Sequence, residues 1–271
     1  MAAPKLSDVL ATVFAQEGCD TLFTLMGDAN MYWTEAMQRQ PGMNIIHARH
    51  EHCAVAMADA YARATGKVGV ASTTCGPGFT QIMTGLAIAA RANTPMVVFA
   101  GDSPIAAPYY IQQIDMAPLT QATGAHHISV KTMDRALDNV REAFHFAALE
   151  RRPVVISIPM DLQKQAYPHM VDYIPSADYL PAAQRPQPDP TLVEKLVEMI
   201  AASEKPMIIA GRGAKLSKAR EAIEEMAEAM GALLTTSLQA KGLLPAIASP
   251  WISLAPMPAI SRANALRKLI W

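Results

Sequence analysis

The stretch RHEHCAVAMADAYARATGKVGVASTTCGPGFTQ, residues 49–81, decides the fold of this chain. It predicts a helix over residues 51–65, with Gly66 as the glycine that ends it. The apolar face of that helix, at helical spacing, consists of Ala54, Met57, Ala58 and Tyr61. A compact strand over residues 68–74 follows and ends in a Gly-Pro-Gly turn. One acidic residue, Glu51, therefore stands where a strand gives way to a helix.

Strands and helices alternate on both sides of this unit, from residue 5 to about residue 162. The predicted strands are residues 21–26, 44–48, 68–74, 95–100, 127–131 and 154–158, and the helices between them are residues 31–38, 51–65, 79–91 and 134–150. Strands rich in Val and Ile with helices between them predict an α/β fold, in which helices cover both faces of a parallel sheet. Ligands bind beyond the carboxyl ends of such strands. Glu51, residues 76–78 and residues 101–103 are all expected at that edge.

Prolines divide the chain into two parts. Seven of them occur between Pro159 and Pro190, which predicts an extended linker and not a packed element. We therefore expect a first domain over residues 1–165, a linker over 166–190 and a second α/β domain over 191–271. The second domain has a helix over residues 192–202, a strand over 206–210, a helix over 217–230 and a strand over 232–236. The pattern then fails, so an incomplete Rossmann-like domain with an atypical tail, residues 246–271, is predicted.

Composition excludes several classes of protein. Apolar residues make up 51% of the chain, charged residues 17%, and the formal net charge is −1, which suits a soluble globular protein with no affinity for nucleic acid. The three cysteines lack the spacing of a zinc site or a disulfide framework, and Cys53 and Cys75 are expected to be small buried residues. The N-terminus is an amphipathic helix pattern, not a signal peptide, and no apolar run is long enough to span a membrane. A cytoplasmic location is expected.

The segment around Glu51 resembles the thiamine-diphosphate-dependent enzymes of the acetolactate synthase and pyruvate decarboxylase group. Residues 49–70 resemble the catalytic-glutamate segment of that family, and TTCGPGFTQ, residues 73–81, resembles its Gly-Pro-Gly loop. IQQID, residues 111–115, resembles its Phe-Gln-Glu-x-Asp motif, and RPVVISIPMD, residues 152–161, the end of its pyrimidine-binding domain. The motifs occur in the family's order and cover roughly residues 5–245.

This resemblance implies specific roles. Glu51 would be the catalytic residue that hydrogen-bonds the pyrimidine nitrogen of thiamine diphosphate, although by itself it also fits an ordinary first-turn acid favoured by the helix dipole. The implied cofactor-binding residues are Gly27, Asp28, Ala29, Thr74, Gly76, Pro77, Gly78 and Gln81. His50 and Gln112 are expected on the substrate or cofactor side. Gly211, Arg212 and Gly213 form a candidate nest for the diphosphate of FAD.

The sequence also departs from the family. Cys75 replaces the commoner serine before Gly-Pro-Gly, and Gln81 replaces an asparagine. The family binds Mg²⁺ and the diphosphate with a Gly-Asp-Gly motif in a third domain, which has no counterpart here. We therefore expect no metal ligands in this chain, and Mg²⁺ only where another domain supplies them. The chain is expected to be a fragment that is inactive alone.

Three functions remain open at this stage. The first is a carboligase or lyase that acts on a 2-oxo acid, with a homodimer or homotetramer as the intact family member. The second is the pyrimidine-binding subunit of a split 2-oxo acid decarboxylase, whose partner chain would carry the Gly-Asp-Gly domain. The third is a non-catalytic interaction module, which would expose apolar surface meant for a second subunit.

Overall fold

The computed structural model describes residues 3–107, 109–169, 172–179 and 187–244. The chain divides into two compact units, Met1–Ala183 and Gln184–Trp271, and each is described by itself. The predicted tail, residues 246–271, and residues 180–186 of the predicted linker lie outside the described residues.

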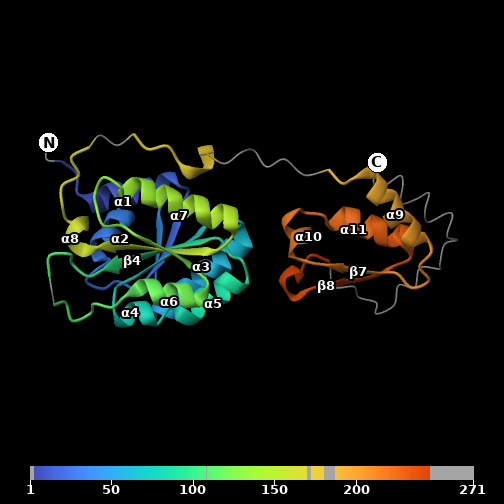
Figure 1. Ribbon diagram of the computed structural model, residues 1–271, viewed down its shortest axis with the longest axis horizontal. Coiled ribbons are helices and arrows are strands. Elements are labelled where there is room, and N and C mark those ends of the chain that lie inside the picture. Colours follow the sequence, from blue (N-terminus) through green and yellow to red (C-terminus); the bar gives the residue numbers. More distant parts are fainter. Residues whose placement is uncertain (1–2, 108, 170–171, 180–186, 245–271) are drawn as a thin grey trace. The chain divides into compact units, whose positions relative to one another are not determined.

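The first unit is built on a parallel sheet of six strands in the order β2-β1-β3-β4-β6-β5 (Figure 1). Every neighbouring pair in it is parallel. The strands are β1 (Thr21–Thr24), β2 (Asn44–His47), β3 (Gly69–Thr73), β4 (Met96–Asp102), β5 (His126–Ser129) and β6 (Pro153–Pro159). The sequence had predicted all six, and the α/β class with a parallel sheet is confirmed.

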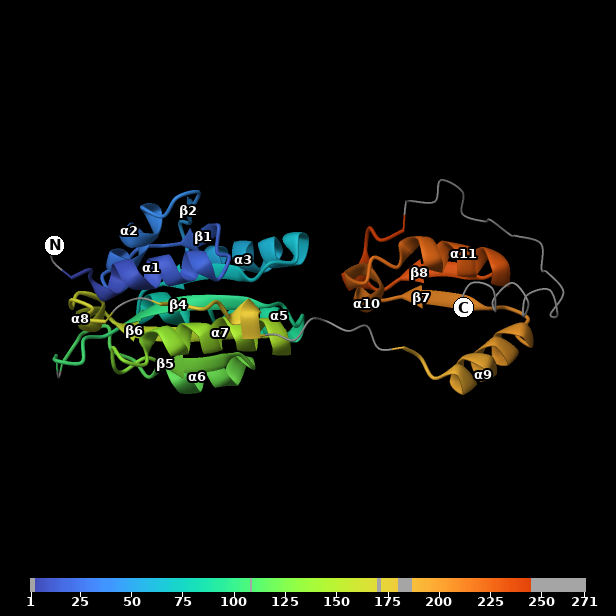
Figure 2. The same ribbon diagram turned by 90° about the horizontal axis from the view of Figure 1, so that it is seen from above.

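Helices cover both faces of this sheet, as α1 and α7 lie on one side and α4, α5 and α6 on the other (Figure 1). The helices of the first unit are α1 (Leu6–Gln16), α2 (Met31–Gln38), α3 (Glu51–Thr65), α4 (Pro77–Thr80), α5 (Met83–Arg91), α6 (Met116–Thr123), α7 (Ala136–Glu150) and α8 (Met160–Gln163). Figure 2 shows α1 and α7 side by side. Because both faces are covered, β3 and β6 are buried along their whole length.

Alternate residues of the central strands supply two separate cores. Val97 and Phe99 of β4 belong to the core under α1, α2 and α7, where the ring of Phe99 stacks on Trp33 with centroids 4.0 Å apart. Val98 and Ala100 belong to the core under α3, α5 and α6. This division follows from the two-residue repeat of a strand, which sends successive side chains to opposite faces. It holds the strand ends, and the loops that follow them, in fixed positions.

Helix α3 has the boundaries that the sequence predicted. His50 is its N-cap and accepts a hydrogen bond at its side chain from the His52 amide, while Gly66 ends it with φ 78°. The helix packs closely on β3 because Gly69 has no side chain: a Cβ there would lie 2.3 Å from the carbonyl oxygen of Ala58. The first residue of this helix is Glu51, so the same packing also places Glu51.

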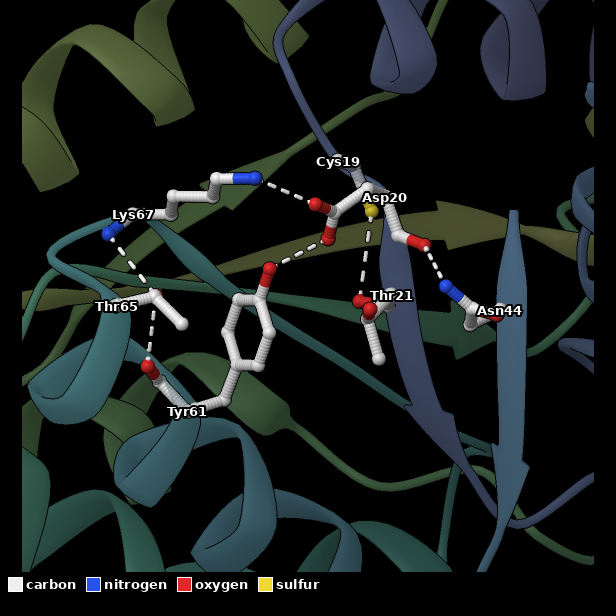
Figure 3. A network of polar contacts seen from close by, with 7 residues as sticks. All are labelled: Cys19, Asp20, Thr21, Asn44, Tyr61, Thr65 and Lys67. Carbon is white, nitrogen blue, oxygen red and sulfur yellow. Dashed lines mark hydrogen bonds and ion pairs between the residues drawn. The ribbon is translucent and has the colours of Figure 1, made fainter. Parts of the chain in front are cut away.

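Asp20 immediately precedes β1 and connects α3 to the amino end of that strand (Figure 3). Its carboxylate accepts a hydrogen bond of 2.5 Å from the Tyr61 hydroxyl and lies 2.5 Å from the Lys67 ammonium group. The hydrogen bonds from Lys67 and then Tyr61 hold the pKa of Asp20 below its usual value. The Asp20 carbonyl also accepts from the Asn44 side chain, which links this corner to β2.

Three local predictions differ from the structure. The helix predicted over residues 79–91 is divided into α4 and α5, and α6 was not predicted. Part of the predicted linker is packed. Tyr173 and Ser176 are buried, and both donate hydrogen bonds to the carboxylate of Glu17, the residue that follows α1. We name residues 172–179 the strap. Arg141 of α7 lies over the Tyr173 ring, 4.7 Å from its centroid, and donates to the Ile174 carbonyl.

The second unit has two parallel strands, β7 (Met207–Ala210) and β8 (Leu233–Thr236), together with α9 (Pro190–Ala201), α10 (Arg212–Leu216) and α11 (Arg220–Met230). Val193, Val197 and Met230 form its small core. The helix predicted over residues 217–230 begins later, at Arg220, after the separate α10. Across the described parts of both units, no helix has the length and apolarity needed to cross a membrane.

Candidate functional site

Four loops meet at the carboxyl edge of the first sheet. They follow β1, β2, β3 and β4, which are consecutive in the order of a parallel sheet and so end on the same side. Gly27, Gly76 and Ser103 lie in the loops after β1, β3 and β4, and Glu51 is the residue at which the loop after β2 enters α3. The convergence that the sequence predicted is therefore present, and we call this region the site edge.

Glu51 lies against the Gly-Pro-Gly turn. It is the first residue of α3 and is half-buried. A Cβ placed on Gly78 would lie 3.0 Å from Glu51 Oε1 and 2.8 Å from Thr74 Cγ2. The absence of a side chain at Gly78 thus leaves the space that the glutamate carboxylate occupies. Pro77 opens α4 at a position where its missing N–H costs nothing.

The loop after β1 packs against the end of β3. A Cβ on Gly27 would lie 2.7 Å from Thr74 Cβ, and the Ala29 amide donates to Thr74 Oγ1 at 3.2 Å. Asn30 closes the loop by accepting from the Gly27 amide at 2.8 Å and donating to Ser72 Oγ at 2.8 Å. Gly27, Ala29 and Thr74 are therefore in mutual contact, as candidate residues of one site should be.

The same loop crosses the end of β4 so closely that no side chain fits there. A Cβ on Gly101 would lie 2.1 Å from the Ala29 carbonyl oxygen. That oxygen also accepts a hydrogen bond of 2.8 Å from Gln163 Nε2, and the same nitrogen donates to the Ile158 carbonyl. The backbone at Ala29 is thereby held from two sides, by β4 and by α8.

Gln112 lies on the other glycine of the turn. Gly76 has φ +63°, and a Cβ on it would lie 2.5 Å from the Gln112 carbonyl oxygen. Cys75 Sγ also lies 3.7 Å from Gln112 Oε1, in hydrogen-bonding geometry for sulfur. The two glycines of Gly-Pro-Gly thus have different neighbours: Gly78 makes room for Glu51, and Gly76 makes room for the backbone of Gln112.

Burial sets the electrostatics beside this turn. It raises the pKa of the Asp102 carboxyl group at the end of β4, although the Ser103 amide and hydroxyl both donate to Asp102 Oδ1. Burial likewise raises the pKa of the Cys75 thiol, with Asp102 and Asp28 adding to the rise. The Cys75 thiol is therefore a weak acid and a poor nucleophile at neutral pH.

Several other predicted residues are exposed or belong to the second unit. Gln81 is exposed at the end of α4, and His50 is exposed and hydrogen-bonds the His52 amide. Gly211, Arg212 and Gly213 belong to the second unit, where they begin the short helix α10 and neither glycine has a positive φ. A nest of the αR–αL type would need a positive φ, so the predicted nest for FAD could take only its turn form at these residues. Cys53 is exposed, so the prediction that it is buried was wrong, whereas Cys75 is buried as predicted.

Three contributors to the site edge were not predicted. Tyr110 donates to Asp28 Oδ2 at 3.3 Å and packs on Ala29, Cys75 and Met160. Gln163 and Asn30 hold the loop after β1, as described above. Asn30 could have been found from its position three residues after Gly27, since asparagine side chains can hydrogen-bond backbone groups three or four residues earlier. Tyr110 and Gln163 had no such local signal.

Acidic, histidine and cysteine side chains are the usual protein ligands of metal ions. In the part of the chain that the structure describes, no group of three or more of them is placed to hold a metal ion. The acidic side chains at the site edge have different neighbours: Glu51 lies against Gly78, Asp28 accepts from Tyr110, and Asp102 accepts from Ser103.

Comparison with family models matches both units. Residues 4–122 match the model described as thiamine pyrophosphate enzyme, N-terminal TPP binding domain. Residues 193–267 match the model described as thiamine pyrophosphate enzyme, central domain. The first match contains the site edge through Gln112, including Glu51 and the Gly-Pro-Gly turn.

Curated relatives are synthases. The acetolactate synthase large subunit of Haemophilus influenzae is 29% identical over 268 residues, which are 96% of this chain and 46% of that protein. The probable acetolactate synthase large subunit of Methanocaldococcus jannaschii is 30% identical over 250 residues, 89% of this chain and 41% of that protein. The chain thus spans less than half the length of either relative.

Solved structures show the same fold. A thiamin diphosphate-dependent enzyme of Mycobacterium smegmatis matches with a TM-score of 0.70 and 24% identity, over 87% of this chain and 45% of that one. The thiamine diphosphate-dependent 4-hydroxybenzoylformate decarboxylase of Rhodococcus jostii RHA1 matches with a TM-score of 0.71 and 19% identity, over 86% and 44% respectively.

Proposed function

Because the chain belongs to the family of thiamine-pyrophosphate-dependent enzymes, we propose that it forms the pyrimidine-binding and central portions of an acetolactate-synthase-like carboligase or lyase. Its substrate class would be a 2-oxo acid. The observation that carries this proposal is the contact between the Glu51 carboxylate and Gly78 at the carboxyl edge of the sheet. It gives the acid at the start of α3 a fixed place beside a glycine that has no side chain.

The residues present fit the ring end of thiamine diphosphate. A half-buried carboxylate stands at a helix N-terminus, beside the backbone of Gly78 and the hydroxyl-bearing side chain of Thr74. When bound, this cofactor supplies a nucleophilic carbon and then an electron sink for the carbanion left by decarboxylation. The proposal assigns the diphosphate end and its Mg²⁺ to no described residue.

Glu51 would hold the proton that this chemistry needs. In our proposal its carboxyl group shares a proton with a ring nitrogen, and its position is set by α3 on one side and Gly78 on the other. Thr74 and Ala29 would form the adjoining wall, because they are already bound to each other. Removing the proton-bearing group should therefore abolish the contact with the ring while leaving the fold intact.

Ligand-observed NMR on the chain with thiamine diphosphate tests this directly. We expect saturation transfer from the protein to the pyrimidine protons, stronger than to the thiazolium protons and independent of Mg²⁺. The Glu51→Gln variant should lower the pyrimidine signal severalfold. Glu150→Gln, at an exposed helix end, is the matched control and should not change it. Equal signals from wild type and Glu51→Gln would refute the role of Glu51.

A separate question is whether this chain is catalytically active alone. We propose that it does not turn over a 2-oxo acid alone, and that the intact enzyme is a homodimer or homotetramer in the cytoplasm. One of the relatives is a chloroplast protein, the acetolactate synthase of Arabidopsis thaliana. The proposal that the chain is inactive alone would be contradicted by tight, Mg²⁺-dependent binding of thiamine diphosphate or by release of carbon dioxide from pyruvate by this chain.

A further inference from the structure

Residues 109–115, which we name the site loop, lie along the site edge with one face inward. The side chains of Tyr110, Gln112 and Ile114 are half-buried, whereas those between them face solvent. Tyr109 and Ile111 are 96% and 97% exposed. The segment turns at Ile111 and Gln112, since the Gln113 amide donates to the Tyr110 carbonyl at 2.8 Å, and one side of it rests on the site edge. The inward face is therefore what fixes this segment in place.

Two side chains of that inward face reach the loops after β1 and β3. Tyr110 donates its hydroxyl to Asp28 Oδ2 at 3.3 Å, across 82 positions of sequence. Gln112 lies two residues further, with its backbone against Gly76 and its side chain beside Cys75 Sγ. The Tyr110 ring covers the buried cluster to which Cys75 belongs.

We propose that Tyr110 is a positioning residue, whose hydrogen bond to Asp28 holds the site loop closed so that Gln112 stays on Gly76. The proposal deepens the proposed function and rests on it, since Gly76 belongs to the turn that also holds Glu51. Tyr110 suits this task because its ring packs against Ala29, Cys75 and Met160, while its hydroxyl reaches Asp28 in the loop after β1. This hydrogen bond thus connects the loop after β1 to the site loop, which lies against the turn after β3.

The phenol stays in its donating form over a wide pH range. Burial raises the pKa of Tyr110, and Cys75 and Asp28 raise it further. The groups that face its hydroxyl from the neighbouring loops are these two, and both disfavour a phenolate. Opening of the site loop by deprotonation is therefore expected only in strongly alkaline solution.

The three cysteines make the position of the site loop measurable. Cys75 is buried beneath it, Cys19 is buried at the far end of β1, and Cys53 is exposed on α3. Alkylation with N-ethylmaleimide, mapped by mass spectrometry, should label Cys53 at once. Labelling of Cys75 reports opening of the site loop, and labelling of Cys19 reports unfolding of the core.

In Tyr110→Phe the ring remains and only the hydroxyl is lost. We expect Cys75 to react about five- to tenfold faster, the factor for one lost hydrogen bond in a local opening equilibrium, with no change at Cys19. Tyr109→Phe is the matched control and should react as the wild type does. Asp28→Asn and Asp28→Ala both remove the charge that raises the Cys75 pKa, but only Asp28→Asn keeps an acceptor oxygen, so Cys75 should react about five- to tenfold faster in Asp28→Ala than in Asp28→Asn.

Each result decides between positioning and mere stability. Unchanged labelling of Cys75 in both Tyr110→Phe and Asp28→Ala would overturn the proposal, as would equal acceleration at Cys75 and Cys19. Hydrogen exchange gives a second readout, with faster exchange expected for amides 109–115 only. Both measurements use the chain without cofactor. A failure of thiamine diphosphate to contact the protein would therefore refute the proposed function separately from the positioning role of Tyr110.

Discussion

Gly78 faces Glu51 so closely that a methyl group in place of its hydrogen would lie 3.0 Å from the glutamate Oε1. It would lie closer still, 2.8 Å, to Thr74 Cγ2. Position 78 therefore controls both the turn after β3 and the carboxylate at the start of α3. The chemistry that we propose for Glu51 depends on this glycine as much as on the acid.

Gly78→Ala should displace both neighbours. We expect a loss of about 1–3 kcal/mol in the free energy of unfolding, since an added methyl group in a packed site costs roughly that much. Urea denaturation measures it. Gly213→Ala is the control, because that glycine lies in α10 with nothing within 4 Å of its Cβ, and it should gain about 0.5–1 kcal/mol. A neutral Gly78→Ala variant would show that the turn has more space than the structure gives it.

Gly76→Ala should cost more, because backbone strain adds to crowding. Gly76 has φ +63° and ψ −127°, a conformation that residues with a side chain rarely adopt, and Gln112 blocks the Cβ position. We expect a loss of about 2–4 kcal/mol in urea denaturation. Gly124→Ala should cost less, since Gly124 is in the αL region, with φ +84° and ψ 6°, and its Cβ position is open, with a nearest contact of 3.6 Å. A loss in Gly124→Ala as large as that in Gly76→Ala would contradict this account.

Asp20 should make stability depend on acid pH. Its pKa is lowered in the folded protein by the hydrogen bonds from Lys67 and Tyr61, so the folded state binds a proton less readily than the unfolded state. Its contribution is therefore fully present above about pH 4, the unfolded value, and is lost as pH falls through the folded pKa. Asp20→Asn should flatten the fall in melting temperature over that range. An unchanged acid profile would mean that Asp20 contributes no pH dependence.

Tyr61→Phe tests the hydrogen bond that an uncharged donor, the Tyr61 hydroxyl, makes to Asp20. The variant keeps the ring against Phe23 and removes only the hydroxyl that donates to Asp20. We expect a loss of about 1 kcal/mol, because Asp20 is partly solvated and water replaces the lost donor. Tyr109→Phe, on a fully exposed side chain, is the control and should lie within about 0.5 kcal/mol of the wild type.

The strap should be a local point of failure. Tyr173→Phe removes one of the three donors to Glu17, and hydrogen bonds to charged groups contribute about 1.5–3 kcal/mol. We expect faster cleavage of residues 172–179 by a protease of broad specificity, together with lower stability in urea. Tyr179→Phe is the control, since the Tyr179 ring lies near Arg141 without a hydroxyl bond to any described residue. Strap cleavage as slow as in the wild type would contradict the role of Glu17.

The fold was largely readable because its signals are local. The limits of α3 follow from one apolar stripe and one glycine, Gly66, and those of β6 from a run of β-branched residues. The apolar repeat continues across residues 79–91, which concealed the break between α4 and α5. Helix α6 lacks a strong apolar stripe and contains Pro118, so no local pattern indicated it.

The site was predicted where a motif carries it and missed where contacts are long-range. Glu51, Thr74 and the Gly-Pro-Gly turn lie within 28 residues of one another, in the stretch that resembles the family. Gln163 reaches Ala29 across 134 positions, and Ser176 reaches Glu17 across 159. No pattern within a short window identifies such partners. Proline content indicated a linker at the strap because composition does not record what a segment packs against.

The hydrogen bonds of Gln163 and the packing of the strap together set the smallest recombinant version of the first unit that is worth expressing. A version that stopped at Pro159 would keep all six strands, yet it would leave the Ala29 carbonyl without its amide donor from α8. Ending at residue 169 would restore that donor but expose the side of α7 on which Tyr173 lies. Residue 179 is therefore the earliest sensible stop for a shortened protein intended for crystallisation or isotope labelling.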